Sequence, residues 1–396
     1  MENQIIIVYP YRFREFDRKR FEVDYLKHYT NVVIHDLIDA LHPHFSPAYH
    51  EFDKSNDVIR FSNLKEWREE YLKKIKSFKG KTYVLNFVPL ITFKELFVNY
   101  ILSSSDVFLI EYSNPGVITD SDITRGFLLK IKTKYLFIAK RASFRWVFIV
   151  ISSRLLRILY LYLCRKSDFI LAVNTKHHKH LSNVISANSF DYSMVMGKIK
   201  GNQFENNNQD SIIYLDTGAP LFSTDSLLYG NRDPITEIWY PALVNLFNII
   251  ENKTGNKVVI AAHPKHKYSK ENEHIFGSRK IIHGKTMDLV SHASLVLVTN
   301  STSVSYAVLF NKPVLVLLSD EIIEDNNILL QQSYKLSSSL GCSSINIDKI
   351  DEKLLNNYSI NSDKYLAYKS KHLSARLDNK TNGEIIINEV INLAPK

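Results

Sequence analysis

The pattern that most constrains this chain is an alternation between short apolar runs and segments of helix length. Five apolar runs in the first half are predicted strands, namely Ile5–Tyr9, Val32–His35, Thr82–Phe87, Val107–Ile110 and Phe169–Val173. Helix-like stretches such as Leu64–Phe78 lie between them. Strands that alternate with helices predict a parallel sheet with helices packed against it.

The second half of the chain repeats this alternation. Its predicted strands are Ile212–Leu215, Val258–Ala261, Leu295–Val298 and Val314–Leu318, and the helix-length segments include Pro234–Lys253. Because 396 residues are about twice the commonest domain size, we expect two doubly wound α/β domains. Ligands of such sheets bind outside the carboxyl ends of the strands, so the cleft between the domains is the expected site.

A polar stretch between Gly197 and Asp210 separates the two halves and is too polar to build a core. We therefore predict a first domain over residues 1–200 and a second over residues 211–380. Residues 381–396 contain apolar positions at Ile385, Ile386, Ile387, Val390 and Ile391, which predict a closing helix.

Composition excludes several classes of protein. Hydrophobic residues make up 45% of the chain and charged residues 23%, as in ordinary globular proteins. The net charge of +9 favours anionic partners. Because no nucleic-acid recognition motif is present, we expect no nucleic-acid partner. Two cysteines without paired spacing and the lack of a secretory signal favour the cytoplasm. Dinucleotide-binding and Walker motifs are absent.

The segment Phe144–Cys164 is long, aromatic-rich and apolar, with Arg154 and Arg157 near its middle. Each arginine would cost about 2.5–3.5 kcal/mol at the centre of a bilayer, so a membrane span is not expected. Basic residues flank it over about residues 130–166, which suits a helix lying on the inner face of the cytoplasmic membrane. A buried helix of the first domain explains the same residues, and both interpretations stay open.

The first candidate binding element is His263-Pro264-Lys265, directly after the apolar strand Val258–Ala261. Proline ends the strand and constrains the turn. The side chains of His263 and Lys265 are suited to donate hydrogen bonds to a phosphate oxygen or to a leaving nucleotide, so His263 is also a catalytic candidate. A turn that only shapes the backbone is the alternative.

The second candidate element is Asn300-Ser301-Thr302-Ser303, between the strand Leu295–Val298 and a predicted helix. Its side chains and backbone N–H groups favour an anion at the start of that helix. The alternative is an ordinary helix cap. Two such turns at the strand ends of one small sheet favour the binding interpretation.

The run from Trp239-Tyr240 through His263-Pro264-Lys265 to Asn300-Ser301-Thr302-Ser303 resembles the donor domain of bacterial CMP-sugar glycosyltransferases. These sialyltransferase-like and Kdo-transferase-like enzymes have the GT-B fold, in which two Rossmann-like domains face a central cleft. The resemblance covers about residues 211–320. It implies that His263 contacts the donor phosphate and that Ser301, Thr302 and Ser303 complete the cradle.

Two acidic residues are candidates for catalysis. The sialyltransferase-like families carry a paired acidic motif followed by glycine in the first domain, and this chain departs from it. Glu111, after the strand Val107–Ile110, is the nearest candidate for a base that deprotonates an acceptor hydroxyl. Asp216 follows the strand Ile212–Leu215 and is predicted to act or to bind donor or acceptor at the cleft.

Three further patterns are weaker. Asp120-Ser121-Asp122 matches a metal-binding triplet of other transferases, but we interpret it as a polar loop. His177, His178 and His180 lack regular ligand spacing, and His42-Pro43-His44 is interpreted as a surface turn. We therefore predict no metal site and no cofactor.

Together these features predict transfer of a sialic-acid-like or Kdo-like sugar from a CMP donor to a surface glycan or glycolipid, such as lipopolysaccharide O-antigen or capsule. Phosphate stabilisation and an acceptor base are sufficient for this reaction. A CDP-glycerol-type polyol-phosphate transferase and a UDP-sugar GT-B glycosyltransferase are the alternatives. The expected partners are the nucleotide-sugar donor, the acceptor and the inner membrane surface.

Overall fold

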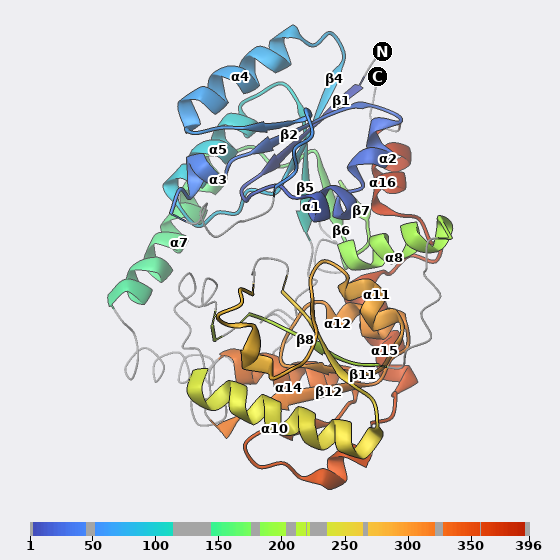
Figure 1. Cartoon of the computed structure of the whole chain (residues 1–396). Coiled ribbons are helices and arrows are strands. Elements are labelled where there is room, and N and C mark those ends of the chain that lie inside the picture. The colour runs from blue at the N-terminus through green and yellow to red at the C-terminus, as the bar shows by residue number, and fades with distance from the viewer. Residues whose placement is uncertain are drawn as a thin grey trace, which may run out of the picture. The chain divides into compact units, whose positions relative to one another are not determined.

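The computed structural model describes residues 3–44, 52–113, 144–175, 183–202, 211–218, 220–221, 236–263, 268–320, 328–356 and 358–392. Contacts divide these residues into two compact units, whose elements are labelled in Figure 1. Unit 1 contains the described residues up to Ala187 and those from Asn382 onward. Unit 2 contains the described residues from Asn188 to Thr381.

Unit 1 is built on a seven-stranded sheet in the order β3-β2-β1-β4-β5-β6-β7, and every neighbouring pair is parallel. The strands are β1 (Asn3–Tyr9), β2 (Asn31–Asp36), β3 (Val58–Arg60), β4 (Lys81–Asn86), β5 (Phe108–Ser113), β6 (Phe169–Ala172) and β7 (Val184–Ser186). β1 lies between β2 and β4, and its residues from Gln4 to Tyr9 are buried. Burial of both faces explains why the central strands are almost continuously apolar.

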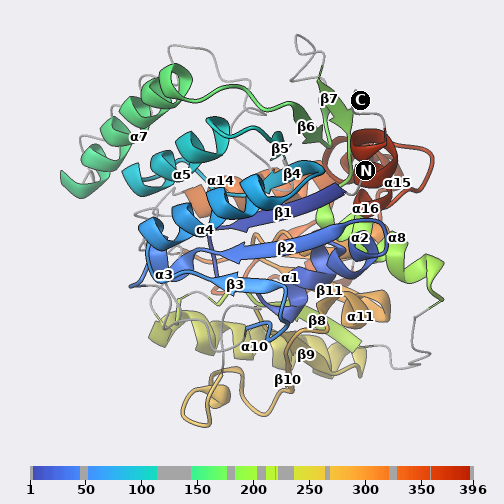
Figure 2. The same ribbon diagram turned by 90° about the horizontal axis from the view of Figure 1, so that it is seen from above.

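Helices cover the sheet of unit 1. They are α1 (Glu15–Arg20), α2 (Val23–Lys27), α3 (Ile38–Leu41), α4 (Leu64–Ser77), α5 (Phe93–Ser103), α7 (Phe144–Leu163) and α16 (Asn382–Ile385). Side chains of α3, α4 and α5 share one core cluster with β1, β4 and β5, and Figure 2 shows α4 and α5 lying across these strands. Asn63 caps α4, and Thr92 forms a capping box with Glu95 at α5.

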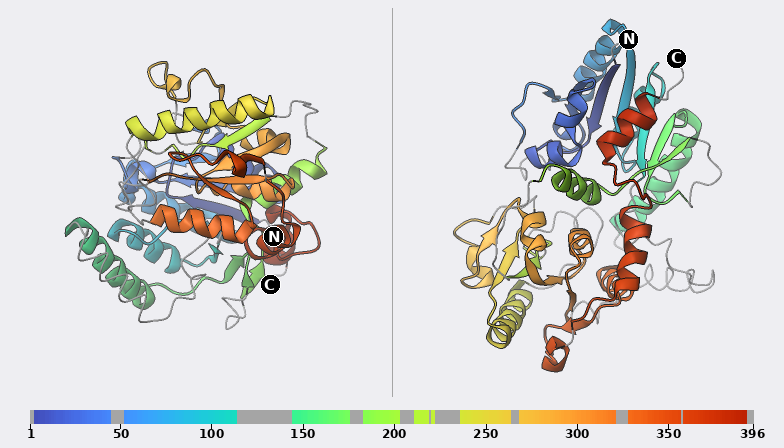
Figure 3. Two further views of the ribbon diagram at one scale, coloured as in Figure 1. Left: turned by 90° about the horizontal axis from the view of Figure 1, so that it is seen from below. Right: turned by 90° about the vertical axis from the view of Figure 1, so that its right-hand side faces the viewer.

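The C-terminal segment returns to unit 1. α16 continues as a π-helix over Ile386–Ile391, beside the N-terminal elements in the right panel of Figure 3. The carboxylate of Glu22 accepts hydrogen bonds from the backbone N–H groups of Asn382 and Gly383, at 3.2 and 3.1 Å. A Cβ atom on Gly383 would lie 2.7 Å from both Glu22 and Tyr25, so glycine permits this close approach.

Unit 2 has a six-stranded parallel sheet in the order β10-β9-β8-β11-β12-β13. The strands are β8 (Ser211–Leu215), β9 (Val258–Ala261), β10 (Ile281–Ile282), β11 (Ala293–Val298), β12 (Val314–Leu318) and β13 (Ser344–Asn346). Successive residues of β8 point to opposite faces: Ile212 and Tyr214 join one core cluster, and Ile213 and Leu215 join the other.

The helices of unit 2 pack on both faces of this sheet. They are α8 (Phe190–Lys200), α10 (Thr236–Thr254), α11 (Thr286–Ser291), α12 (Val304–Leu309), α14 (Ile328–Leu340) and α15 (Ser362–Tyr368). Shorter turns of helix span Glu273–Phe276, Glu352–Asn356 and Lys369–Leu373. α10 supplies Trp239, Leu243 and Phe247 to one face, and α8 and α12 contribute to the other.

The predicted fold class is confirmed, since both halves are doubly wound parallel α/β sheets. The contacts separate the units between Ala187 and Asn188, earlier than the polar stretch between Gly197 and Asp210. Tyr192 and Val195 of α8 are buried in a core cluster of unit 2, which explains this earlier boundary.

Candidate functional site

The strand order of unit 2 marks one place on its sheet as the expected binding site. β8 and β11 are neighbours at the centre, and the chain winds outward from them in opposite directions. Open α/β sheets bind ligands outside the carboxyl ends of the strands at such a switch point. Asp216 follows β8 there, and the turn from Thr299 to Ser303 follows β11.

Asp216 is the centre of a buried hydrogen-bond cluster. Its Oδ1 accepts from the backbone N–H of Gly218 at 2.8 Å. Its Oδ2 accepts from the hydroxyl of Tyr268 at 2.7 Å and from the backbone N–H of His263 at 3.3 Å. The side chain is buried, and this desolvation raises the pKa of the carboxyl above its ordinary value, although the three hydrogen bonds oppose the rise.

This cluster connects the ends of two adjacent strands. β8 and β9 pair up to Leu215 and Ala261, so Asp216 and His263 lie just beyond the ends of neighbouring strands. The hydrogen bond from the backbone N–H of His263 to Asp216 links the chain that leaves β9 to the end of β8. The predicted binding residues Pro264 and Lys265 lie outside the described residues.

Tyr268 belongs to this cluster although the sequence analysis did not select it. Burial, and then the charge of Asp216, raises the pKa of its phenol well above the ordinary value, so the hydroxyl remains a donor. The ring lies 6.2 Å from that of His283, which follows β10. A tyrosine five residues after His263 is the signal that pattern analysis passed over.

The turn after β11 has a mixture of anchored and exposed groups. The amide of Asn300 donates to Oε1 of Gln332 in α14 at 2.9 Å. The hydroxyl of Ser301 accepts from the backbone N–H of Ser303 at 3.3 Å, and Thr302 is exposed. Asn300 therefore holds the turn, while the side chain of Thr302 is available to a ligand.

The helix that follows this turn is short. α12 has only six residues, and Ser303 precedes it without a side-chain cap hydrogen bond. Because the dipole of a helix sums over its aligned peptide units, so short a helix provides little attraction for an anion. A ligand at this turn would therefore be held by hydroxyl and backbone N–H groups rather than by the helix dipole.

Glu111, the predicted acceptor base, lies on β5 of unit 1. Its Oε1 accepts a hydrogen bond from the hydroxyl of Tyr160 in α7 at 2.8 Å. Burial, and then the charge of Glu111, raises the pKa of the Tyr160 phenol. Glu111 thus connects the sheet to α7, a role that the sequence pattern did not indicate.

The remaining candidate patterns have different outcomes. His42-Pro43-His44 forms the predicted turn, but the ring of His42 contacts the carboxylate of buried Glu95 at 3.0 Å. The triplet Asp120-Ser121-Asp122 lies outside the described residues, as do His177, His178 and His180.

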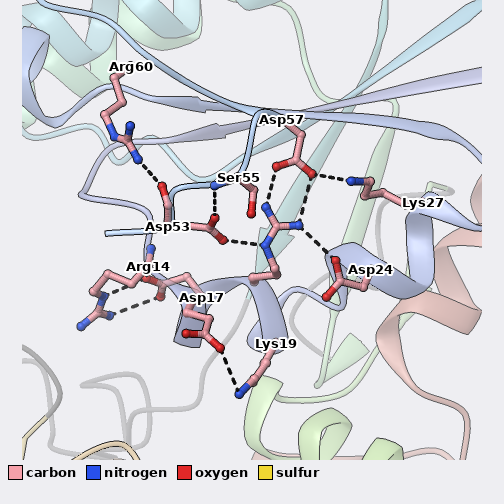
Figure 4. Close-up of polar contacts among 11 residues, drawn as sticks. Arg14, Asp17, Lys19, Asp24, Lys27, Asp53, Ser55, Asp57 and Arg60 are labelled. Atoms are coloured by element: carbon pink, nitrogen blue, oxygen red, sulfur yellow. Dashed lines mark hydrogen bonds and ion pairs between the residues drawn. The ribbon is translucent and has the colours of Figure 1, made fainter. Parts of the chain in front are cut away.

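Unit 1 holds the chain after its own central strand in a different way. Arg12 binds Asp39 through both carboxylate oxygens, at 3.0 and 2.8 Å. Arg18 in α1 contacts the carboxylates of three residues that are labelled in Figure 4: Asp53 and Asp57 at 2.5 Å each, and Asp24 at 3.1 Å. These ion pairs tie the segment after β1 to α2, to α3 and to the residues that precede β3.

Comparison with known proteins shows the fold. No protein-family model and no curated protein matches the chain. A variant of the wall teichoic acid polymerase TagF has a similar structure, with a TM-score of 0.52, 9% identity, and coverage of 99% of this chain and 89% of that chain. This similarity shows that the chain has the GT-B fold.

Two further solved structures have lower similarity scores. UDP-GlcNAc 2-epimerase from Methanocaldococcus jannaschii, in complex with UDP-GlcNAc and UDP, gives a TM-score of 0.49 at 11% identity, covering 99% of this chain and 100% of that chain. Arabidopsis thaliana UGT89C1 complexed with UDP gives 0.49 at 9% identity, with both chains covered completely.

Proposed function

We propose that this protein is a glycosyltransferase that takes a nucleotide-activated sugar and transfers the sugar to a glycan or glycolipid. The observation that carries the proposal is the arrangement at the switch point of unit 2. Asp216, His263 and Tyr268 form one hydrogen-bonded cluster there, and a hydroxyl-rich turn follows the neighbouring strand. This is where an open α/β sheet presents groups to a nucleotide.

The roles that we assign follow from the positions of these residues at the ends of β9 and β11. In the transfer, the bond between the sugar carbon and the phosphate oxygen breaks while the acceptor oxygen bonds to that carbon. The proton of the acceptor passes to a base, and the nucleotide leaves with additional negative charge. We assign His263 to stabilise that charge, and Thr302 to bind a phosphate or ribose oxygen.

Asp216 has a positioning role in this proposal. Its carboxylate oxygens accept three hydrogen bonds inside the cluster, and its side chain is buried. A carboxylate so occupied is poorly placed to take a proton from an acceptor. Holding the backbone of His263 is the function that its contacts support.

The donor that we place first carries UDP. The chain lacks the paired acidic motif of the CMP-sugar enzymes, and the nearest substitute, Glu111, is hydrogen-bonded to Tyr160. This contact weakens the case for a CMP-linked sialic-acid-like or Kdo-like sugar, which becomes the second donor. No metal is needed in this scheme, so turnover should survive EDTA.

A second candidate function is polyol-phosphate transfer from a CDP-linked donor. It is favoured by the similarity in fold to TagF, which is a wall teichoic acid polymerase. Such a reaction adds phosphorus to the product, whereas sugar transfer does not. Phosphorus analysis of the product therefore distinguishes the two.

A nucleotide screen tests the proposal. UDP, CMP, CDP and GDP are compared by thermal shift, since a ligand at 100 times its dissociation constant stabilises a protein by about 2.7 kcal/mol. We expect UDP to give the largest shift. Stabilisation by CMP or CDP alone would reassign the donor, and no stabilisation by any of the four would overturn the proposal.

The variant His263→Ala makes the test specific to the site. We expect a loss of turnover of about 10²–10³-fold, the usual cost of removing one donor to charge that develops in the transition state. His274→Ala, an exposed histidine of the same unit, is the matched control and should keep normal turnover. Near-normal turnover in His263→Ala with an unchanged melting temperature would remove His263 from the mechanism.

A further inference from the structure

α5 has two apolar faces, of which the core of unit 1 uses one. Leu96, Val98, Ile101 and Leu102 are buried, whereas Phe93, Phe97 and Tyr100 are exposed by 59%, 37% and 42%. The exposed three stand at positions i, i+4 and i+7, so they form one stripe along the helix. Three large aromatic side chains left in solvent on one stripe require an explanation beyond the packing of the core.

α7 shows the same division over residues 154–163, where its side chains are described. Leu156 is buried and Tyr160 donates to Glu111, so one side of the helix is attached to the sheet. The other side exposes large apolar residues, namely Leu155, Ile158, Leu161 and Tyr162. The sequence left open whether this helix is buried or interfacial. Over the described residues, one face of the helix is packed against unit 1 and the other is exposed.

The two helices lie side by side in unit 1, as Figures 1 and 2 both show. Because the two helices are neighbours, we treat their exposed apolar residues as one region of the surface, which we call the α5–α7 face. It comprises Phe93, Phe97, Tyr100, Leu155, Ile158, Leu161 and Tyr162. An apolar surface of this kind on a folded unit marks an interaction site.

The charges on these helices indicate the kind of partner. Arg154 and Arg157 are exposed among the apolar residues of α7, and Lys166 is exposed just beyond its end. α7 contains no acidic residue, and the one acidic residue of α5, Glu95, is buried. Aromatic and aliphatic side chains mixed with exposed basic ones are the composition of surfaces that lie on anionic bilayers.

None of the helices in the described part of the chain combines the length and apolar character that a membrane crossing needs. We propose that the α5–α7 face docks unit 1 on an anionic lipid bilayer, with its apolar side chains at the acyl boundary and Arg154 and Arg157 at the headgroups. The proposal requires no substrate and does not depend on the proposed function.

Vesicle sedimentation tests the apolar part of this inference. The full-length protein should sediment with vesicles rich in phosphatidylglycerol and stay in solution with pure phosphatidylcholine vesicles. The double variant Phe93→Ser, Phe97→Ser should weaken vesicle binding at least tenfold while the protein stays folded, which its melting transition checks. Tyr334→Ser, Leu366→Ser, which removes two exposed apolar side chains of unit 2, is the control and should bind like the native protein.

Charge reversal tests the electrostatic part. Arg154→Glu, Arg157→Glu should weaken binding at least tenfold at low salt, because each basic residue near an anionic leaflet contributes to binding. Lys65→Glu, Arg68→Glu on α4 is the control, because both residues are exposed, stand three positions apart and change the net charge by the same amount. This pair should have little effect on vesicle binding. If both charge-reversal pairs weakened vesicle binding equally, binding would depend on net charge alone. That result would overturn the proposal that the α5–α7 face docks on the bilayer.

Two other results would also overturn the proposal. One is unchanged vesicle binding by the double serine variant of α5. The other is a lipid-free dimer, detected by analytical ultracentrifugation, that the same variant dissociates, because the face would then belong to a second copy of the chain.

Discussion

The two units arrange their central strands identically but hold the chain that leaves those strands by different means. After β1 in unit 1, Arg12 and Arg18 form ion pairs with carboxylates of other segments. After β8 in unit 2, Asp216 is buried among uncharged donors, namely the hydroxyl of Tyr268 and two backbone N–H groups. The same topology thus supports one loop in which ion pairs accompany the buried acid Asp36, which accepts from the backbone N–H of Phe13, and another organised around a single buried acid without ion pairs.

The effect of the ion pairs appears in the pKa values of the two carboxyl groups that Arg18 contacts most closely. Burial alone would raise the pKa of Asp53 and Asp57, but hydrogen bonds and the charge of Arg18 outweigh it and leave both below the ordinary value. At Asp216, burial prevails and the pKa is raised. Acid therefore removes stabilisation at Asp53 and Asp57 as pH falls below about 4, whereas at Asp216 it relieves a cost.

The largest effect on stability is expected from Arg18→Met. The substitution leaves the buried carboxylate of Asp53 and the nearly buried carboxylate of Asp57 without their guanidinium partner. Breaking such a pair from one side costs about 3–5 kcal/mol of unfolding free energy. Urea unfolding measures the loss.

Arg68→Met is the control for this experiment, because Arg68 is exposed on α4 of the same unit. It should change the unfolding free energy by less than about 0.5 kcal/mol. A loss below about 1 kcal/mol in Arg18→Met would mean that the ion pairs of unit 1 are as weak as ordinary surface pairs.

Tyr268→Phe tests the uncharged cluster of unit 2. Removing the hydroxyl takes one donor from the buried carboxylate of Asp216, which should cost about 1–3 kcal/mol. If Asp216 positions His263, turnover should fall as well, and the pH at which the variant loses activity should move as the pKa of Asp216 rises further.

Tyr365→Phe is its matched control, because the buried Tyr365 donates to the carbonyl of Lys312 at 2.8 Å in the same unit. It should lose similar stability and keep normal turnover and an unchanged pH profile. Equal effects of the two variants on turnover would reduce the Asp216 cluster to an ordinary structural contact.

The last prediction concerns acid sensitivity in unit 1. His35 on β2 is fully buried, accepts a hydrogen bond from Trp67 Nε1 at 3.2 Å, and has its pKa lowered to about 3, chiefly by burial. The unfolded state therefore binds the proton first. Stability is complete above about pH 6.5 and declines as pH falls towards 3, by at most about 1.4 kcal/mol per pH unit.

Unfolding free energies of His35→Gln, measured from pH 7 to pH 4, test this slope. Glutamine can accept the Trp67 hydrogen bond but does not titrate, so the variant should lose less stability on acidification than the native protein. His274→Gln, an exposed control in unit 2, should keep the native slope. Equal slopes for all three proteins would contradict the buried neutral state of His35.

The central strands were predictable because each consists of several consecutive apolar residues. Each of the nine predicted strands is present. The four that pattern analysis missed are β3, β7, β10 and β13, which are two or three residues long and stand at the edges of the sheets. An edge strand has a neighbour on one side only, so its residues are less uniformly apolar and give a weak local signal.

The candidate site was predictable where it depends on strand ends. Asp216 and His263 follow apolar strands directly, and parallel pairing places such residues at one edge of a sheet. The same reasoning selected Glu111, whose hydrogen bond to Tyr160 joins residues 49 positions apart. Tyr268 was missed because its bond to Asp216 spans 52 positions.

The sequence by itself determined the two α/β halves, their central strands and the polar turns at the strand ends. These features follow from the spacing of apolar residues over short segments of the sequence. Tertiary structure alone decided that α8 belongs to unit 2, that Arg18 meets three carboxylates, and which face of α5 remains exposed. The physical reason is that local spacing specifies which residues share a face. Which segment packs against that face depends on contacts between parts of the chain that are distant in the sequence.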